Sequence, residues 1–182
     1  FVDQYHLNNT AQTVNGTKGT ADCDIDAPEA WKVHPRSGPE VVIAVLDTGV
    51  YYTHQDLANA MWTNPGEAPG NSIDDDGNGF VDDVHGYDFA GNDGTSGNGA
   101  NGCPMDRRYH GTHVSGIAAA SANNGIGIAG VSPAKIMALK ISRDGANIDS
   151  LAAIAAIDYA VMMKESHEVN IVALNMSYGG LG

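Results

Sequence analysis

Two short motifs in this sequence carry side chains that could act together in proton transfer. Asp47 follows the apolar run 41–46 and is succeeded by Thr48-Gly49, while His110 opens the sequence His-Gly-Thr-His-Val. A His that acts as a general base needs a buried carboxylate to fix its tautomer and to stabilise its imidazolium form. An Asp at the end of a strand and a His at the start of a helix can supply that pair. Asp before His is the order in which one hydrolytic triad places its first two members, with the Ser last.

Each motif is weak alone, and the two together are specific. A single Asp-Thr-Gly also occurs as half of the two-carboxylate site of aspartic proteases, but the chain has one copy only. His110 and His113 are three residues apart and lie near one face of a helix, as a metal-binding pair would. However, Gly111 stands where zinc proteases place a Glu after the first His. The pattern therefore favours the Asp47–His110 pair over a metal site.

With its motifs in this order, the sequence resembles the subtilisin-like serine proteases (subtilases), from about residue 22 to residue 182. The resemblance implies that Asp47 orients His110 and that His110 is the general base for a Ser. The family's Ser and its oxyanion-hole Asn lie further along the chain, and no Gly-Thr-Ser-Met-Ala-like motif is present before Gly182. We therefore expect the N-terminal part of a calcium-stabilised endopeptidase, truncated before the Ser motif and inactive alone. The missing Ser leaves one alternative, a non-catalytic calcium-binding fragment or inactive protease module.

The segment 174–180 is similar to the family segment that lies beside the substrate. In the family, this backbone pairs with the peptide as an added strand, which gives affinity without strong sequence preference. The resemblance implies that Ser177, Tyr178 and Gly179 bind substrate and that Ser177 is a pocket residue, not the nucleophile. The alternative is a plain turn at the end of a strand.

A run of acidic residues between positions 74 and 83 has the spacing of a calcium-binding loop. EF-hand loops take ligands from alternate positions and place a Gly at the sharp turn, here Gly79. The last EF-hand position falls on His85, which cannot supply a bidentate carboxylate, so Asp83, Glu67 or Asn71 would have to take its place. A solvated acidic turn is the alternative. The expected calcium ligands are Asp74, Asp76, Asn78, the carbonyl of Phe80, Asp82 and Asp83.

The resemblance implies a second calcium site on the segment 122–128, which follows the His motif. A weaker third site would use Asp88, Asp93 and Thr95. The expected ligands of the second site are Asp56, Asn124, the carbonyls of Ala122, Ile126 and Ile128, and Asp3.

The composition limits the kinds of binding partner and the cellular location that can be expected. The formal net charge of −13 argues against nucleic acid or an anionic membrane surface. No apolar run is long enough to cross a membrane and the N-terminus does not have a signal peptide's pattern. We expect a mature secreted, extracellular or periplasmic protein that acts on proteins or peptides, with a second polypeptide that carries the Ser, or a prodomain, as a further partner. Cys23 and Cys103 could form a disulfide or remain free thiols.

The elements that must position these residues alternate between strand and helix. Apolar runs predict strands over 41–46, 135–141 and 169–176, and between them helices are expected over 110–122 and 150–164. A further short helix is expected to start at Asp26, with Asp26 as its cap. This order predicts a subtilisin-like α/β fold, a three-layer parallel sheet with helices on both faces. The expected organisation is an irregular N-terminal arm (1–25), then the N-terminal portion of a catalytic domain (26–182) with a long loop over 63–106.

Overall fold

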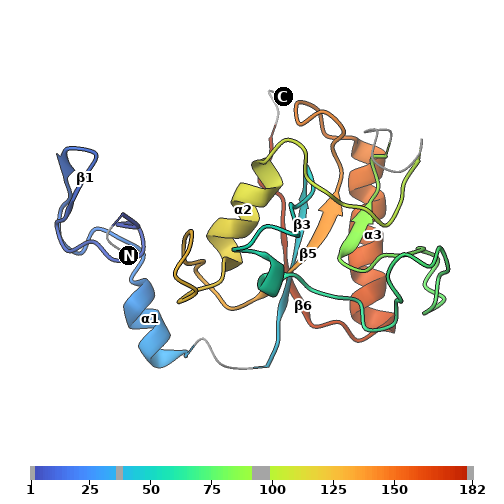
Figure 1. The fold of residues 1–182 in the computed structure, drawn as a ribbon, viewed down its shortest axis with the longest axis horizontal. Helices are drawn as coiled ribbons and strands as arrows, with labels where there is room; N and C mark the ends of the chain where they lie inside the picture. The colour runs from blue at the N-terminus through green and yellow to red at the C-terminus, as the bar shows by residue number, and fades with distance from the viewer. Residues whose placement is uncertain (1–2, 36–38, 92–98, 180–182) are drawn as a thin grey trace.

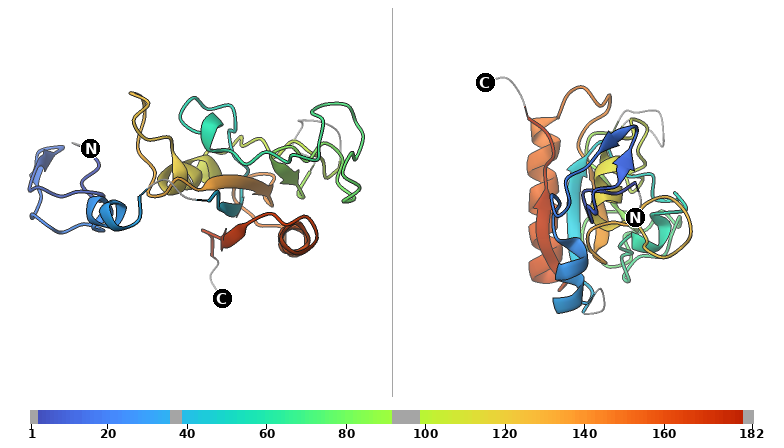
Figure 2. Two further views of the ribbon diagram at one scale, coloured as in Figure 1. Left: turned by 90° about the horizontal axis from the view of Figure 1, so that it is seen from below. Right: turned by 90° about the vertical axis from the view of Figure 1, so that its left-hand side faces the viewer.

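The computed structural model describes residues 3–35, 39–91 and 99–179. Its centre is a four-stranded parallel sheet in the order β4-β5-β3-β6 (Figure 1). Helices α2 and α3 lie on opposite faces of this sheet (Figure 2), so the prediction of a three-layer α/β fold is confirmed. These elements are β3 (Val42–Asp47), β4 (Gly86–Asp88), α2 (His110–Ala119), β5 (Lys135–Lys140), α3 (Ser150–Ser166) and β6 (Ile171–Asn175).

Strand β3 is apolar throughout because both of its faces are covered. Ala44 and Leu46 pack in a cluster with α3, whereas Val45 points to the other face and packs in a cluster with α2. A parallel strand buried on both faces requires such a continuous apolar run. The strand therefore delivers its last residue, Asp47, to the carboxyl edge of the sheet, level with Lys140 of β5.

Three short strands were not expected from the sequence. Strand β4, within the long loop, adds an edge to the sheet, and Gly86 there packs so closely that a Cβ would lie 2.1 Å from the Ala138 carbonyl oxygen. Its three residues, Gly-Tyr-Asp, are too few for apolar periodicity to reveal. The N-terminal arm, expected to be irregular, contains a hairpin of β1 (Thr13–Val14) and β2 (Thr17–Lys18). Each of these strands has two residues, which is also too short for an alternating apolar pattern.

The ends of the helices follow local capping chemistry. Asp149 caps α3 as expected, and its carboxylate accepts hydrogen bonds from the backbone N–H groups of Leu151 and Ala152. The predicted cap of α1 (Ala27–Val33) by Asp26 is wrong, because Asp26 has a left-handed backbone (φ 54°) and its side chain bonds none of the helix. A capping side chain normally requires an extended backbone at that position. A short 3₁₀ helix, η1 (Ala58–Ala60), completes the set.

The N-terminal arm is attached to the loop that follows α2. Leu7 and Ala27 pack against Ala129 of that loop. The side chain of Gln4 bonds both backbone groups of Ala129, donating to its carbonyl and accepting from its N–H. In Figure 1 the arm lies to one side of the sheet. Among the described residues, no helix is long and apolar enough to span a membrane.

Removal of the Leu46 side chain should destabilise the fold that holds Asp47. Leu46 is fully buried, so Leu46→Ala should lower the free energy of unfolding by about 2–5 kcal/mol. Leu151→Ala, at a position that is 79% exposed, is the control and should change it little. Urea denaturation followed by circular dichroism measures both; equal effects would contradict the packing described for β3.

Candidate functional site

Asp47 and His110 meet at the carboxyl edge of the sheet. The Nδ1 atom of His110 lies 2.8 and 2.9 Å from the two carboxylate oxygens of Asp47. Asp47 is 2% exposed, whereas the His110 side chain is 54% exposed. Because an ionised carboxylate can only accept, Nδ1 carries the proton and Nε2 of the neutral ring is left with its lone pair. The pair has the arrangement of a general base held in one tautomer by a buried acid.

Gly111 allows the helix to approach the turn after β3 this closely. Its N–H donates to Thr48 Oγ1 over 3.0 Å, and a Cβ at this position would lie 2.2 Å from the carbonyl oxygen of Gly49. No side chain fits in that space, so this position requires glycine because the helix backbone contacts the turn after β3. His113, by contrast, is exposed and belongs to no group of three metal-ligating side chains found in the described part of the chain.

Asp106 is a buried residue at this site that sequence reasoning missed. Its carboxylate accepts hydrogen bonds from both the turn after β3 and the first turn of α2. Asp106 lies three residues before the N-cap position of α2, so the usual capping pattern does not reveal it. Tyr109, which immediately precedes the helix, has a left-handed backbone (φ 69°) and provides no side-chain cap.

The predicted substrate segment leaves β6 beside the Asp47 end of β3. Asn175, at the end of β6, pairs in register with Val45, and its amide exchanges hydrogen bonds with the Ser177 hydroxyl. Burial raises the pKa of the Tyr178 phenol, and the nearby negative charge of Asp47 adds to this rise. A Cβ built on Gly179 would meet nothing within 4 Å. The structure thus brings the segment near Asp47, while its role in substrate binding remains a prediction.

The acidic loop is organised around a cluster that differs from the expected ligand set. Carboxylate oxygens of Glu67, Asp76 and Asp83 all lie within 4.8 Å of one another. Asp74 instead accepts hydrogen bonds from the backbone N–H groups of Asn78 and Gly79. The structure therefore joins two of the expected carboxylates to Glu67, which the sequence offered only as a substitute.

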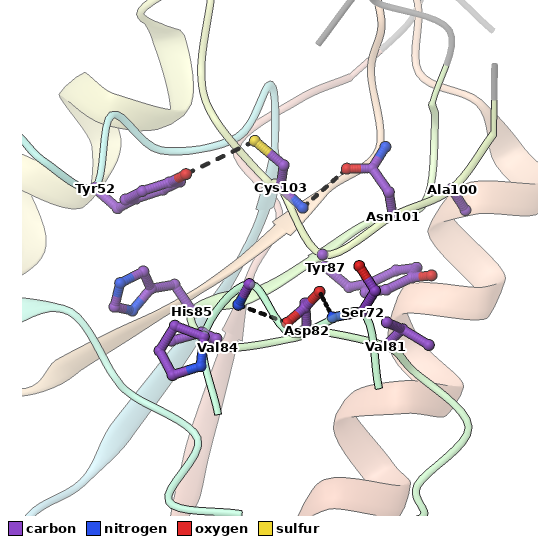
Figure 3. Close-up of a pocket in the computed structure, with 13 residues that line it drawn as sticks. Tyr52, Ser72, Val81, Asp82, Val84, His85, Tyr87, Ala100, Asn101 and Cys103 are labelled. Carbon is purple, nitrogen blue, oxygen red and sulfur yellow. Dashed lines mark hydrogen bonds between the residues drawn. The ribbon is translucent and has the colours of Figure 1, made fainter. Parts of the chain in front are cut away.

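Asp82 turns away from this cluster. Its carboxylate accepts hydrogen bonds from the backbone N–H groups of Gly70, Asn71 and Ser72, and Figure 3 shows it pointing toward Ser72. These contacts tie the two arms of the loop together. They account for the position of Asp82 without a bound metal ion.

The surroundings of the cluster fit a cation of the calcium type. The NH₂ groups of Asn64 and Asn78 donate to the carboxylates of Asp76 and Asp83, and the hydroxyl of Tyr159 on α3 donates to Asp83 over 2.5 Å. Burial raises the pKa of the Asp83 carboxyl, and burial and then the charge of Asp83 raise the pKa of Tyr159. Carboxylate oxygens grouped in this way are donors that calcium prefers. A bound cation would offset the repulsion among the three acids.

The second predicted calcium loop folds around Asp56. The buried carboxylate of Asp56 accepts hydrogen bonds from the Asn124 amide (2.7 Å) and from the Ile128 backbone N–H (2.8 Å). Gly127 lies against it, because a Cβ there would be 2.0 Å from Asp56 Oδ2. Asp3 is exposed, and Gln4 from the N-terminal arm accepts a hydrogen bond from the backbone N–H of Ala129, the residue after this segment. The loop brings together Asp56 and the segment Ala122–Ile128 as expected, with Gln4 as a residue that the sequence analysis missed.

The third predicted site is only partly described. Asp93 and Thr95 lie outside the described residues. Asp88 is fully buried, and its carboxylate lies 3.3 Å from the ammonium group of Lys140 and accepts the N–H groups of Ala90 and Gly91. These contacts explain why the Asp88 carboxylate is buried within the sheet.

The two cysteines are free thiols. Cys23 is exposed in the arm, and Cys103 borders a cavity of about 670 Å³ between the acidic loop and the segment 100–103 (Figure 3). The Cys103 sulfur lies 3.7 Å from the hydroxyl of Tyr52, whose pKa is raised to about 12, chiefly by burial. The disulfide that the sequence left open is not formed.

Comparison with known proteins agrees with the motifs. The model of the subtilase family matches residues 38–181. The chain is similar to subtilisin-like protease 1 of Plasmodium vivax (41% identical over 130 residues, 70% of this chain and 19% of the relative). It is also similar to subtilisin-like protease 1 of Plasmodium falciparum (47% over 90 residues, 49% and 12%) and to thermitase of Thermoactinomyces vulgaris (37% over 118 residues, 64% and 31%). The chain thus spans less than a third of the length of each of these relatives.

Gly111→Ala should separate His110 from Asp47, because the added methyl group would overlap the Gly49 carbonyl. We expect loss of the low-field proton resonance of the His110 Nδ1–H group in NMR spectra. Gly116→Ala in the same helix is the matched control, since its nearest neighbour would be 3.7 Å away, and it should retain the resonance. An unchanged resonance in Gly111→Ala would contradict the close approach described above.

Proposed function

Because the chain belongs to the subtilase family, we propose that it supplies the Asp and the His of the triad of a subtilisin-like serine endopeptidase. The observation that carries this proposal is the bond between His110 Nδ1 and the buried Asp47 carboxylate. The nucleophilic Ser and the oxyanion hole come from outside these 182 residues. The whole enzyme hydrolyses peptide bonds in protein or peptide substrates.

In the proposed mechanism, Asp47 holds His110 with the proton on Nδ1. Nε2 then takes the proton of the Ser hydroxyl as the Ser attacks the peptide carbonyl. The imidazolium that forms is stabilised by the Asp47 charge and returns its proton to the leaving amine. Asp47 stays ionised throughout. Water then hydrolyses the acyl-enzyme by the same proton transfers in reverse order.

We place the peptide substrate beside the end of β6. The outer side of β6 has no strand partner within the described sheet, and the segment Ser177–Gly179 continues from its end toward Asp47. A peptide added along this segment would be held chiefly by backbone hydrogen bonds. This supports Ser177, Tyr178 and Gly179 as substrate-binding residues and favours broad sequence tolerance.

We propose that calcium binds two loops and stabilises them without entering the reaction. In the acidic loop, Glu67, Asp76 and Asp83 would hold the ion, and the Asn78 amide, which donates to two of these carboxylates, would have to turn its oxygen toward the ion. In the other loop, the Asn124 amide, which donates to Asp56, would have to turn in the same way. The remaining ligands proposed there are Asp56, Asp3 and the carbonyls of Ala122, Ile126 and Ile128. Calcium would supply positive charge that offsets repulsion among buried carboxylates, and Tyr159 would transmit this restraint to α3 through its bond to Asp83.

We infer that the enzyme works outside the cytoplasm, in a secreted, extracellular or periplasmic setting. Calcium sites of modest affinity are typical of that setting. Extracellular modules bind calcium with dissociation constants of about 10⁻⁴–10⁻³ M. The further partner is a polypeptide that carries the Ser, or a prodomain.

A fluorophosphonate probe tests the catalytic proposal. The complete protein should form an adduct on a Ser outside residues 1–182, found by intact mass and peptide mapping. His110→Ala should slow substrate turnover on the order of 10⁶-fold and Asp47→Ala on the order of 10⁴-fold, magnitudes established on subtilisin itself. No adduct on any polypeptide would instead support the non-catalytic calcium-binding reading.

Calcium removal should lower the melting temperature of the chain. Free calcium at about 100 times its Kd adds about 2.7 kcal/mol, which corresponds to roughly 5–10 °C for a domain of this size. Asp76→Asn should lose the acidic loop's part of the shift that EDTA produces. Asp75→Asn is the control one residue away, because Asp75 is exposed and outside the cluster. If EDTA left the melting temperature of the wild type unchanged, the calcium proposal would be wrong. If EDTA shifted the melting temperatures of both variants equally, the ion would not bind at Asp76.

A further inference from the structure

Asp106 is a buried acid that receives hydrogen bonds from two elements at once. It is 5% exposed and lies between the 100–103 segment and α2. Every neighbour bonded to its carboxylate is a donor, so the group is acceptor-only and ionised. The donors are Thr48 Oγ1 at 3.0 Å, the N–H groups of Arg108, Tyr109 and Thr112 at 2.7, 2.9 and 3.0 Å, and Thr112 Oγ1 at 2.5 Å.

Two threonine hydroxyls extend this contact in opposite directions. Thr48, next to Asp47, donates to Asp106 and accepts the N–H of Gly111, next to His110. Thr112 on α2 donates to Asp106 and accepts the N–H of Tyr51, on the segment after β3. Each hydroxyl therefore joins the Asp47 side to the His110 side, and both are fixed by the same carboxylate.

Asp106 is itself fixed to the segment that follows β3. Its backbone N–H donates to the Val50 carbonyl, and the Val50 N–H donates to the Pro104 carbonyl. Its charge faces the N-terminus of the ten-residue helix α2, where an anion is favoured. Hydrogen bonds to an ionised acceptor are about twice as strong as neutral ones. The start of α2 is thus held against the Asp47 turn by charge-assisted bonds.

We propose that Asp106 is the positioning residue of the Asp47–His110 pair. It sets the separation between the turn after β3 and the first turn of α2, at which His110 Nδ1 reaches both oxygens of Asp47. The effect of this positioning on catalysis rests on the proposed function. The hydrogen-bond geometry around Asp106 is independent of it. A residue that merely caps α2 would affect the stability of the helix and leave the bond between Asp47 and His110 unchanged.

Asp106→Asn is the most direct test. Whichever way the new amide is turned, its NH₂ group faces donors, because both carboxylate oxygens now accept. In the full chain labelled with ¹⁵N-histidine, we expect loss of the low-field Nδ1–H resonance of His110. Asp149→Ala is the control for lost helix capping: it removes the cap of α3 and should lower the melting temperature but retain the resonance. A retained wild-type resonance in folded Asp106→Asn would overturn the proposal.

Thr48 provides a milder variant that decides the case if Asp106→Asn does not fold. Thr48→Val removes the hydroxyl and should weaken the resonance and speed its exchange with water. Thr48→Ser keeps the hydroxyl and should restore both. Equal behaviour of Val and Ser would contradict the relay through Asp106. Because this readout needs no Ser nucleophile, a failed fluorophosphonate reaction would remove the proposed function while leaving the positioning role to be judged by the resonance.

Discussion

The hydrogen bond between His110 and the buried Asp47 carboxylate is the constraint around which the structure is arranged. A solvent-exposed imidazole has no fixed tautomer, and here the carboxylate imposes one. The carboxylate must be delivered by an element that keeps it dry, and β3 does this because both of its faces are covered. The imidazole must remain half exposed to reach a nucleophile, so it comes from the first residue of a helix.

Bringing a strand end and a helix start this close requires both a space and a restraint. Gly111 provides the space, since no Cβ fits beside Gly49. Asp106 provides the restraint, since its carboxylate accepts from Thr48 on one side and Thr112 on the other. An acid with all its lone pairs facing donors holds its neighbours more strongly than neutral groups do. The Asp47–His110 pair is therefore supported by a second carboxylate, that of Asp106. None of the hydrogen bonds described for this carboxylate goes to the imidazole.

The acidic loop presents the opposite electrostatic situation. Carboxylate oxygens of Glu67, Asp76 and Asp83 face one another, and the imidazole Nδ1 of His167 lies 3.9 Å from an Asp76 oxygen. Buried like charges raise one another's free energy, and the raised pKa of Asp83 reflects its burial. The loop is nevertheless connected to the core through Tyr159. A cation at this cluster would offset the repulsion among the three acids, one of which is bonded to α3 through Tyr159.

The sequence by itself predicted three of the four sheet strands, the helices on either face and the pairing of Asp47 with His110, because these depend on local signals. Apolar runs define β3, β5 and β6, the Asp149 cap defines the start of α3, and two motifs define Asp47 and His110. The tertiary structure alone decided which acids lie close together. Asp74 and Asp82 fit a ligand spacing, yet their carboxylates bond backbone N–H groups of their own loop, while the distant Glu67 joins Asp76 and Asp83. Spacing along a chain cannot show which way a side chain turns in a loop, and Asp106 and Gln4 acquired their partners only when segments far apart in sequence came together.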